Sequence, residues 1–589
     1  MASSYMTPGV YIEEKNAFPG SAVAVETAVP VFIGYTEKAE RKGVSLVGEP
    51  IRVTSFAEYV QWFGHGYNHV FNISNVGLED GKKAIQDKAD AAIAKETDAA
   101  KQKIIQDKAN ADKLAFKQTA LDFTKLNTDL DTATKAAKPD QATIDAEKDP
   151  VKKKGLQDQR DAALKALITT NIAAFKSSML LEPLKKFYFY NCIRLFYQNG
   201  GSNCYIMSIG TYGGLNAASA EVNKDDFSTP DYDVFKKLEK TFEPTMVVIP
   251  DFVSQRDKCY ELYVDVLTHC RKTQSRFGIF DVIPDAADAD DPATILYFRN
   301  KIGSEALNYG AAYYPWLNST IVSDSEVNFT NLNMNWKDLK FILPEADVAT
   351  VLSKWEAPAA TDDAETIERK NKTLHQSLLA SSIIYTQIMA EVKNRLNLLP
   401  PSAAMAGIYS MVDGTRGVWK APANVSLSMV SSPAVNISSD EQQNMNIDAT
   451  TGKSVNAIRP FPGLGSLVWG ARTLDGNSQD WRYINVRRTM IMIEQSLKLA
   501  CRSYVFEPND SATWVTMKSM MNNFLNNLWK QGALAGAVPE QAFDVQVGLG
   551  ATMTPQDILD GYLLVTVKLA LVRPAEFIVL TFQQQQQQS

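Results

Sequence analysis

Residues 561–582 carry the pattern that most constrains the fold of this chain. Between Leu563 and Leu571, apolar residues alternate with other residues, a period of two that is typical of a strand with one apolar face. A second β-rich run, 577–582, follows Pro574. Strands at the end of a chain carry backbone groups that can pair with another chain. This part of the chain is therefore predicted to take part in assembly.

The N-terminal residues are similar in kind. Residues 5–14 favour extended backbone and are broken at Pro8 and Gly9. A chain whose two ends are both strand-like has two segments that can pair with other copies of itself. No segment indicates a catalytic site as clearly as the two ends indicate assembly, so the sequence favours an assembly protein.

Length and composition exclude several classes of protein. The 589 residues are too many for one core and predict roughly three to four domains. A hydrophobic content of 45% is typical of globular proteins, and a net charge of −7 argues against a nucleic-acid binder. The sequence contains no secretory signal pattern and no apolar run as long as a membrane span. Five scattered cysteines without a CxxC pair favour reduced thiols and a cytoplasmic location.

Changes in composition predict an α+β multidomain protein. Between 241 and 283, a strand, an amphipathic helix over 260–270 and a second strand indicate an α/β sandwich. Two further helices are predicted over 485–500 and after Asp510 or Ser511. The predicted parts are an N-terminal arm (1–30), the first part of the body (31–79 and 181–240), a helical insertion (80–180), an α/β domain (241–400), a C-terminal α+β domain (401–560), a C-terminal strand arm (561–582) and a disordered glutamine tail (583–589).

The insertion differs from its surroundings in composition. Residues 82–154 contain no glycine, tryptophan, tyrosine or cysteine, and apolar residues recur at a spacing of three to four from Phe116 to Leu130. We interpret residues 80–180 as two antiparallel helices with a polar outer face. The alternative is a solvated charged helix or a partly disordered segment. Either form predicts a peripheral position.

One segment is similar to the end of a phosphate-binding P-loop. Residues 450–454 read TTGKS, but the glycine that the motif requires five residues before Gly452 is replaced by Ile447. No strand precedes the segment and no clear helix follows it. A polar loop is therefore favoured over a phosphate site.

The histidines and acidic residues give no stronger signal. His65 and His69 have the spacing of metal ligands on a helix, but their surroundings are rich in glycine and no third ligand is evident. His269 and His375 lie in helical patterns without a nucleophile signature. The acidic residues 285–292 lack the register of a calcium loop. We therefore predict no catalytic residue, cofactor or metal, although a ligand site at the carboxyl ends of the α/β strands stays open.

Several stretches carry a resemblance to a known family. Residues 400–409 (PPSAAMAGIY) and 413–424 (DGTRGVWKAPAN) resemble the signature of contractile tail sheath proteins, which form the sheaths of contractile phage tails, R-type pyocins and extracellular contractile injection systems. Further similar stretches, in the same order, are 7–14, 483–488, 506–509 with Trp514, and 573–578. The resemblance covers the N-terminal arm, parts of the middle region and nearly all of 400–582. The insertion and the glutamine tail are departures from it.

The resemblance implies a structural sheath subunit. Subunits of this family stack as rings around an inner tube, and their terminal arms add strands to a sheet in neighbouring subunits. The extended sheath would be a metastable state that contracts and drives the tube through a target envelope. The implied partners are other copies of the chain, the tube protein, and baseplate and cap proteins, with no nucleic acid and no membrane insertion. The particle would assemble in the cytoplasm and be released or anchored to an envelope.

The resemblance also suggests which residues make contacts between subunits. Those expected in the inter-subunit sheet are Val10, Tyr11, Ile12, Val565, Val567, Leu569, Phe577 and Ile578. The alternative is that the C-terminal strands pair only within their own chain. Candidate tube contacts on the two C-terminal helices are Arg487, Arg488, Lys498, Lys518 and Lys530. Arg487 and Arg488 could equally form internal ion pairs. The rival functions are another tail-like component, associated with the baseplate or tube, and an α/β enzyme.

Overall fold

The computed structural model of the chain forms two compact units. The first, here the body, comprises 1–67, 187–321 and 398–589, and the second, here the inserted unit, comprises 68–186 and 322–397. The residues that the structure describes are 22–75, 141–156, 179–212, 222–284 and 293–580 (except 344, 360 and 449), together with a few positions between 86 and 108 and at 158–159.

A nine-stranded sheet forms the centre of the body. Its order is β13-β16-β15-β10-β9-β8-β1-β7-β4. The six strands from β15 to β7 are parallel to one another. Every residue of β1 is buried, as is typical of a parallel strand covered on both faces. The strands are β1 (Pro30–Thr36), β4 (Pro50–Val53), β7 (Cys204–Thr211), β8 (Met246–Val248), β9 (Phe277–Asp281), β10 (Gly310–Tyr314), β13 (Val425–Ser426), β15 (Asn456–Phe461) and β16 (Gly465–Val468).

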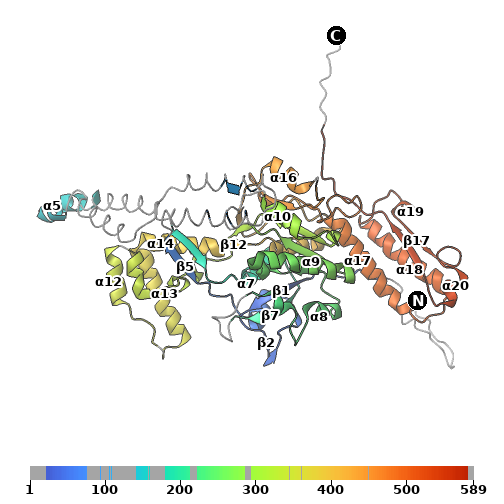
Figure 1. Ribbon diagram of the computed structural model, residues 1–589, viewed down its shortest axis with the longest axis horizontal. Helices are drawn as coiled ribbons and strands as arrows, with labels where there is room; N and C mark the ends of the chain where they lie inside the picture. The colour runs from blue at the N-terminus through green and yellow to red at the C-terminus, as the bar shows by residue number, and fades with distance from the viewer. Residues whose placement is uncertain are drawn as a thin grey trace, which may run out of the picture. The chain divides into compact units, whose positions relative to one another are not determined.

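Helices cover both faces of the sheet (Figure 1). Helix α9 (Arg256–Thr273) packs in one hydrophobic cluster with Val31 and Ile33 of β1. Helices α7 (Phe189–Gln198) and α15 (Ser402–Arg416) pack in a second cluster with Phe32, which points to the opposite face. The predicted α/β sandwich is therefore present. The other described body elements are β2 (Glu40–Arg41), β3 (Val44–Ser45), α1 (Phe56–Phe63), α8 (Val234–Lys240), α10 (Ala293–Lys301), β11 (Leu317–Ser319), β12 (Leu398–Leu399), β14 (Val430–Pro433) and α16 (Ser439–Asn446).

The predicted domain boundaries differ from those of the structure. Strands β7 and β8 lie on either side of the predicted boundary at 240/241, yet both belong to one sheet. Strand β15 follows the predicted boundary at 400/401 and pairs with β10 in that same sheet. Residues 322–397, assigned from sequence to the α/β domain, instead belong to the inserted unit. These boundaries were wrong because parallel pairing joins segments that are distant in sequence.

The C-terminal part of the body is a helical pair with a hairpin. Helix α17 (Ile484–Cys501) and helix α18 (Ser511–Lys530) confirm the two predicted helices. The cap of α18 is also as predicted, because Asp510 accepts a hydrogen bond from the Thr513 amide at 3.0 Å. Both helices share a hydrophobic cluster with the hairpin. The remaining elements here are β17 (Phe543–Val547), β18 (Val565–Leu569), α19 (Pro539–Ala542) and α20 (Pro555–Leu559).

The described part of the inserted unit contains helices and a two-stranded antiparallel sheet. Strand β5 (Phe71–Asn75) pairs antiparallel with β6 (Met179–Pro183). Most of the helical pair predicted over 80–180 lies outside the described residues; helix is present at 141–146 and 150–156. The other helices are α11 (Leu339–Ile342), α12 (Ala346–Lys354), α13 (Ala364–Ser381) and α14 (Ile383–Leu396). Of all the helices described in either unit, none has the length and hydropathy to cross a membrane.

Candidate functional site

The C-terminal segment is held to the body through the carboxylate of Glu576. Arg472 donates hydrogen bonds to it from Nη2 at 2.7 Å and from Nε at 3.0 Å, Asn446 Nδ2 donates at 2.8 Å, and the Tyr483 hydroxyl donates at 3.1 Å. The Arg472 side chain is 3% exposed and that of Glu576 is 20% exposed. Burial acts to raise the pKa of Glu576, but these hydrogen bonds outweigh it and hold the pKa below its ordinary value. We call this group of residues the C-terminal clamp.

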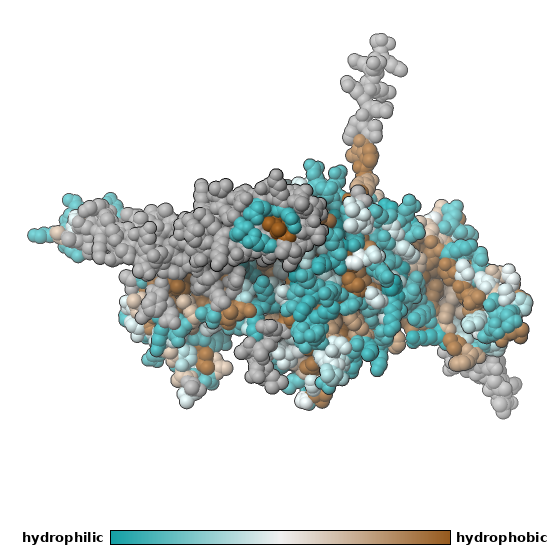
Figure 2. Space-filling view, viewed as in Figure 1, coloured by the Kyte–Doolittle hydropathy of each residue, from teal (hydrophilic) through white to brown (hydrophobic). Residues whose placement is uncertain are grey.

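An exposed apolar segment follows the clamp directly. Phe577 is 68% exposed, and Ile578, Val579 and Leu580 are exposed by 79%, 85% and 73%. Residues 577–580, the described part of the second predicted strand, form no strand with any other described residue. Figure 1 shows the segment running away from the body, and in Figure 2 it is the brown stretch below the grey tail. A contiguous exposed apolar segment of this kind marks a site of interaction.

The first predicted C-terminal strand pairs within the chain. Val565, Val567 and Leu569 lie in β18, are half-buried, and pack on the cluster of α17 and α18. Strand β18 pairs antiparallel with β17, where Val545 faces Val567. The hairpin is a sheet of two strands, so within the described part of the chain the outer edge of each strand has no further partner. It therefore offers edges that a strand from another subunit could join.

The N-terminal segment is also attached to α17. Val10, Tyr11 and Ile12 lie outside the described residues. Further along, the Val25 amide donates to Ser496 Oγ at 3.0 Å. This hydrogen bond places the N-terminal segment on α17 shortly before β1 begins.

A buried ion pair holds the next residues of that segment. Arg488 and Asp413 form a bidentate pair at 2.9 and 2.6 Å, and their side chains are 4% and 3% exposed. Arg488 Nη2 also donates to the Thr27 carbonyl at 3.0 Å, and the Thr27 hydroxyl donates to Asp413 at 2.7 Å. The guanidinium lies over the ring of Tyr409, 4.7 Å from its centroid. We call this group the N-terminal clamp.

The predicted tube contacts fall into two classes. Arg487 is buried, donates to the Tyr309 hydroxyl at 2.8 Å and lies over the ring of Trp481. Arg488 is buried as well, so both arginines correspond to the internal alternative. Neither side chain lies on the surface of the body, where a tube could contact it. Lys498 on α17, and Lys518 and Lys530 on α18, are exposed.

The segment similar to a P-loop is folded into the body. Lys453 is 8% exposed, and its amine donates to the Arg299 carbonyl oxygen. The Ser454 hydroxyl donates to the Asn446 carbonyl at 2.6 Å. Because both side chains bond to backbone of the same chain, the interpretation of 450–454 as a polar loop is confirmed.

The histidines have structural partners. Arg276 bonds to His269 Nε2 at 2.7 Å, and burial together with the Arg276 charge lowers the pKa of His269 to about 4. His375 Nδ1 bonds to the Tyr385 hydroxyl at 2.8 Å. Among the residues with a described placement, no group of three potential ligands could hold a metal ion. The acidic residues 285–292 lie outside that set.

Two buried carboxylates at the carboxyl end of the sheet bind the N-termini of helices. Asp251, just after β8, accepts from the amides of Tyr188 and Phe189 at 2.7 and 2.8 Å, where α7 begins. Asp281, the last residue of β9, accepts from the Ser402 amide at 2.7 Å and from its hydroxyl at 2.6 Å, where α15 begins. Burial raises the pKa of each carboxyl to about 7. The sequence analysis did not identify either residue.

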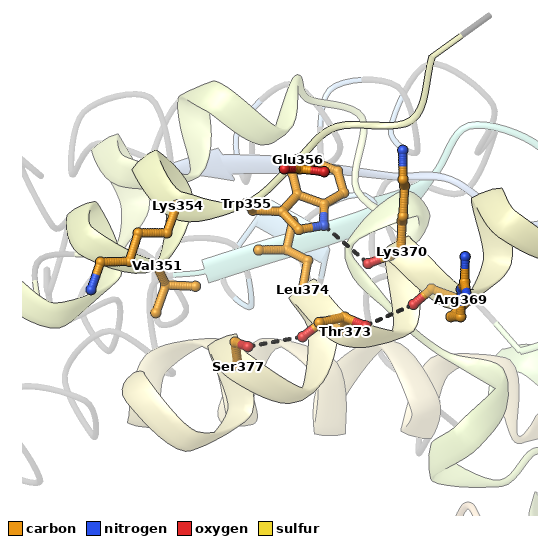
Figure 3. Close-up of a pocket in the computed structure, with 9 residues that line it drawn as sticks. All are labelled: Val351, Lys354, Trp355, Glu356, Arg369, Lys370, Thr373, Leu374 and Ser377. Atoms are coloured by element: carbon orange, nitrogen blue, oxygen red, sulfur yellow. Dashed lines mark hydrogen bonds between the residues drawn. The ribbon is translucent and has the colours of Figure 1, made fainter. Parts of the chain in front are cut away.

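A cavity of about 500 Å³ lies in the inserted unit (Figure 3). It is lined by Val351, Lys354, Trp355, Glu356, Arg369, Lys370, Thr373, Leu374 and Ser377. The indole of Trp355 donates to the Lys370 carbonyl at 3.0 Å. The hydroxyls of Thr373 and Ser377 donate to carbonyls of their own helix at 2.9 Å, so neither is paired with a base. The lining therefore does not form a nucleophile–base pair.

Comparison with known proteins shows that part of the sequence is similar to one family. Residues 477–585 match the family model of the phage tail sheath C-terminal domain. The chain is 23% identical over 190 residues to the tail sheath protein of Vibrio phage KVP40, which is 32% of this chain and 27% of that protein. The match therefore spans about a quarter of the relative's length.

Two solved structures resemble the fold over almost the whole chain. One is the PVC sheath of an extracellular contractile injection system in the contracted state, with a TM-score of 0.52 and 22% identity over 99% of each chain. The other is the helical sheath of the anti-feeding prophage in the contracted state, with a TM-score of 0.52 and 24% identity, covering 99% of this chain and 100% of that one. The chain therefore has a mixed α/β fold of the kind found in these sheaths.

Proposed function

We propose that this chain, whose residues 477–585 match the phage tail sheath C-terminal domain, is a structural subunit of a contractile sheath. The observation that carries the proposal is the family match together with the likeness in fold to two contracted sheaths over 99% of the chain. The subunit would polymerise helically around an inner tube as part of a phage tail-like particle. Its partners would be other copies of itself, the tube protein, and baseplate and cap proteins.

The terminal arms would link neighbouring subunits by strand addition. The exposed segment 577–580 supports this role, because it is apolar and has no strand partner among the described residues. The β17–β18 hairpin supports it as well, since a sheet of two strands can accept further strands at its outer edges. Val10, Tyr11 and Ile12 of the N-terminal arm would supply another of these strands. Such head-to-tail contacts produce open helical assemblies.

The outward faces of α17 and α18 would contact the tube. Lys498, Lys518 and Lys530 are exposed on these helices and have no ion pair within the described residues. Exposed lysines can steer a partner of opposite charge, and such contacts weaken as salt is added. They could therefore hold the extended sheath to the tube and be released on contraction.

Electron microscopy of the chain mixed with its tube protein tests the proposal. We expect hollow, helically striated sheaths around the tube with the full-length chain. A variant truncated after Glu576 should stay folded, because the clamp and the body are intact, and should not polymerise. Uncoated tubes in both samples, under conditions where the chain is folded, would contradict a sheath function. Normal sheaths from the truncated variant would contradict the role of the C-terminal arm alone.

A further inference from the structure

Helix α17 contacts both terminal segments of the chain. The residue before the helix, Tyr483, donates to Glu576, and Asn485 in its first turn donates to the Val572 carbonyl at 3.0 Å. Arg488, about one turn later, donates to the Thr27 carbonyl. The C-terminal segment is therefore held beside the first turn of α17, and the N-terminal segment lies along the helix between Ser496 and Arg488.

The helix is well suited to act as a rigid support. Residues 484–489 are all buried, so its N-terminal half is packed on every side. The Arg488–Asp413 pair holds the N-terminal segment at α17, and the Arg472–Glu576 pair holds the C-terminal segment beside the start of the helix; pairs of this kind are strong and directional. Before Glu576 and after Thr27 the chain is attached to the body, whereas beyond Glu576 it is exposed.

From this arrangement we propose that α17 transmits tension between the two terminal arms of a subunit, with the N-terminal and C-terminal clamps as the points where tension enters. The inference rests on the proposed sheath function, in which each arm is paired with a different neighbour. Tension on one arm would then pass through the clamp and along the first turns of α17 to the other arm.

The C-terminal clamp would also determine how many residues before the exposed segment are free to extend. If the C-terminal clamp opens, residues 573–576 can extend, because Val572 stays bonded to Asn485; this released chain has a contour length of roughly 13 Å at about 3.3 Å per residue. A longer tether lowers the effective concentration of an arm at the edge that it must join. The clamp residues Glu576 and Arg472 would therefore be positioning residues for strand addition, although they lie outside the added strand itself.

Substitution of Glu576 by glutamine tests the inference, because the side chain keeps its size and loses its charge. The matched control is Arg573→Gln, which removes an exposed ion pair to Asp480 at 3.7 Å only three residues away. The first readout uses the unassembled chain. A nitroxide is attached to a cysteine at the exposed position of Ala575, in a Cys501→Ser background because Cys501 is the partly exposed native cysteine. We expect a more mobile nitroxide in Glu576→Gln than in the wild-type or Arg573→Gln chain.

The second readout counts sheath-coated tubes in electron micrographs after mixing with the tube protein. We expect Glu576→Gln to give roughly tenfold fewer coated tubes than wild type, and Arg573→Gln to match wild type. Unchanged nitroxide mobility in Glu576→Gln would overturn the inference, because the clamp would then not hold the segment. Increased mobility with normal coating would overturn it as well. If the wild-type chain coats no tubes, the proposed function itself fails, whereas the mobility result still decides whether the clamp holds the segment.

Discussion

Replacing Asp413 by alanine removes the carboxylate that neutralises Arg488 in the N-terminal clamp. Both side chains are less than 5% exposed, so the guanidinium would stay buried without a counter-charge. Breaking a buried pair in this way costs about 3–5 kcal/mol. The free energy of unfolding of the body should fall by about this amount. With an m value of about 3 kcal/mol/M for a unit of this size, the urea midpoint should fall by roughly 1 to 1.7 M.

The assay is urea unfolding followed by intrinsic fluorescence, with Asp480→Ala as the control. Asp480 pairs with Arg573 at 3.7 Å and its side chain is 80% exposed, so its loss should cost less than about 1 kcal/mol. The double variant Asp413→Leu with Arg488→Met removes both buried charges and should regain most of the lost stability. A midpoint for Asp413→Ala equal to that of the control would refute the reasoning. A double variant no more stable than Asp413→Ala would refute the assignment of the cost to an uncompensated charge.

Three further predictions can be checked with purified chains. A Cβ at Gly407 in α15 would lie 2.6 Å from a backbone oxygen of α7, so Gly407→Ala should lower the urea midpoint. A Cβ at Gly414 in the same helix would meet no atom within 4 Å, so Gly414→Ala should raise the free energy of unfolding by about 0.5–1 kcal/mol. Burial raises the folded-state pKa of Asp281 to about 7, above its unfolded value, so the stability that this carboxyl contributes is complete at acid pH and is lost as pH rises through 7. The urea midpoint should therefore fall less between pH 5 and 8 in Asp281→Asn than in wild type. An equal fall of the midpoint in both chains would contradict this. Reversing the charges of Lys518 and Lys530 should weaken co-sedimentation with tubes at low salt and leave the urea midpoint unchanged; unchanged co-sedimentation would exclude both lysines from the tube contact.

Local patterns were sufficient to predict many elements of the fold. The strand–helix–strand unit of β8, α9 and β9 was predicted because each of its elements has its own periodicity and they follow one another closely. Helix α18 was predicted together with its Asp510 cap for the same reason. The sheet as a whole was not predictable in this way. The pairing of β10 with β15 joins segments about 140 residues apart, and no local pattern indicates which strands will be neighbours.

The clamps were beyond sequence reasoning for a similar reason. The partners of Glu576 lie 93, 104 and 130 residues away, and each is an ordinary polar residue in its local context. The burial of Arg487 and Arg488, which corresponds to the internal alternative, has a different cause. The apolar stripe of α17 implied one buried face, but the N-terminal half of the helix is packed on all sides, so even its charged residues are internal. The described residues 577–580 of the second predicted strand are exposed and apolar, and the pairing of this strand with another subunit stays a prediction.

The buried charged residues of the body bind helix N-termini and terminal segments, and these contacts favour a mechanical role over a chemical one. In doubly wound sheets, ligands bind at the carboxyl ends of the strands, and reactive carboxyl groups are expected there. Here Asp251 and Asp281 occupy such positions, and each accepts hydrogen bonds from the start of a helix. The buried charges of Arg488 and Arg472 hold terminal segments in the same manner. A sheath subunit of the proposed kind, whose neighbours would pull on both of its terminal segments, would need strong, directional contacts between those segments and the body, and two of the buried ion pairs lie at such contacts.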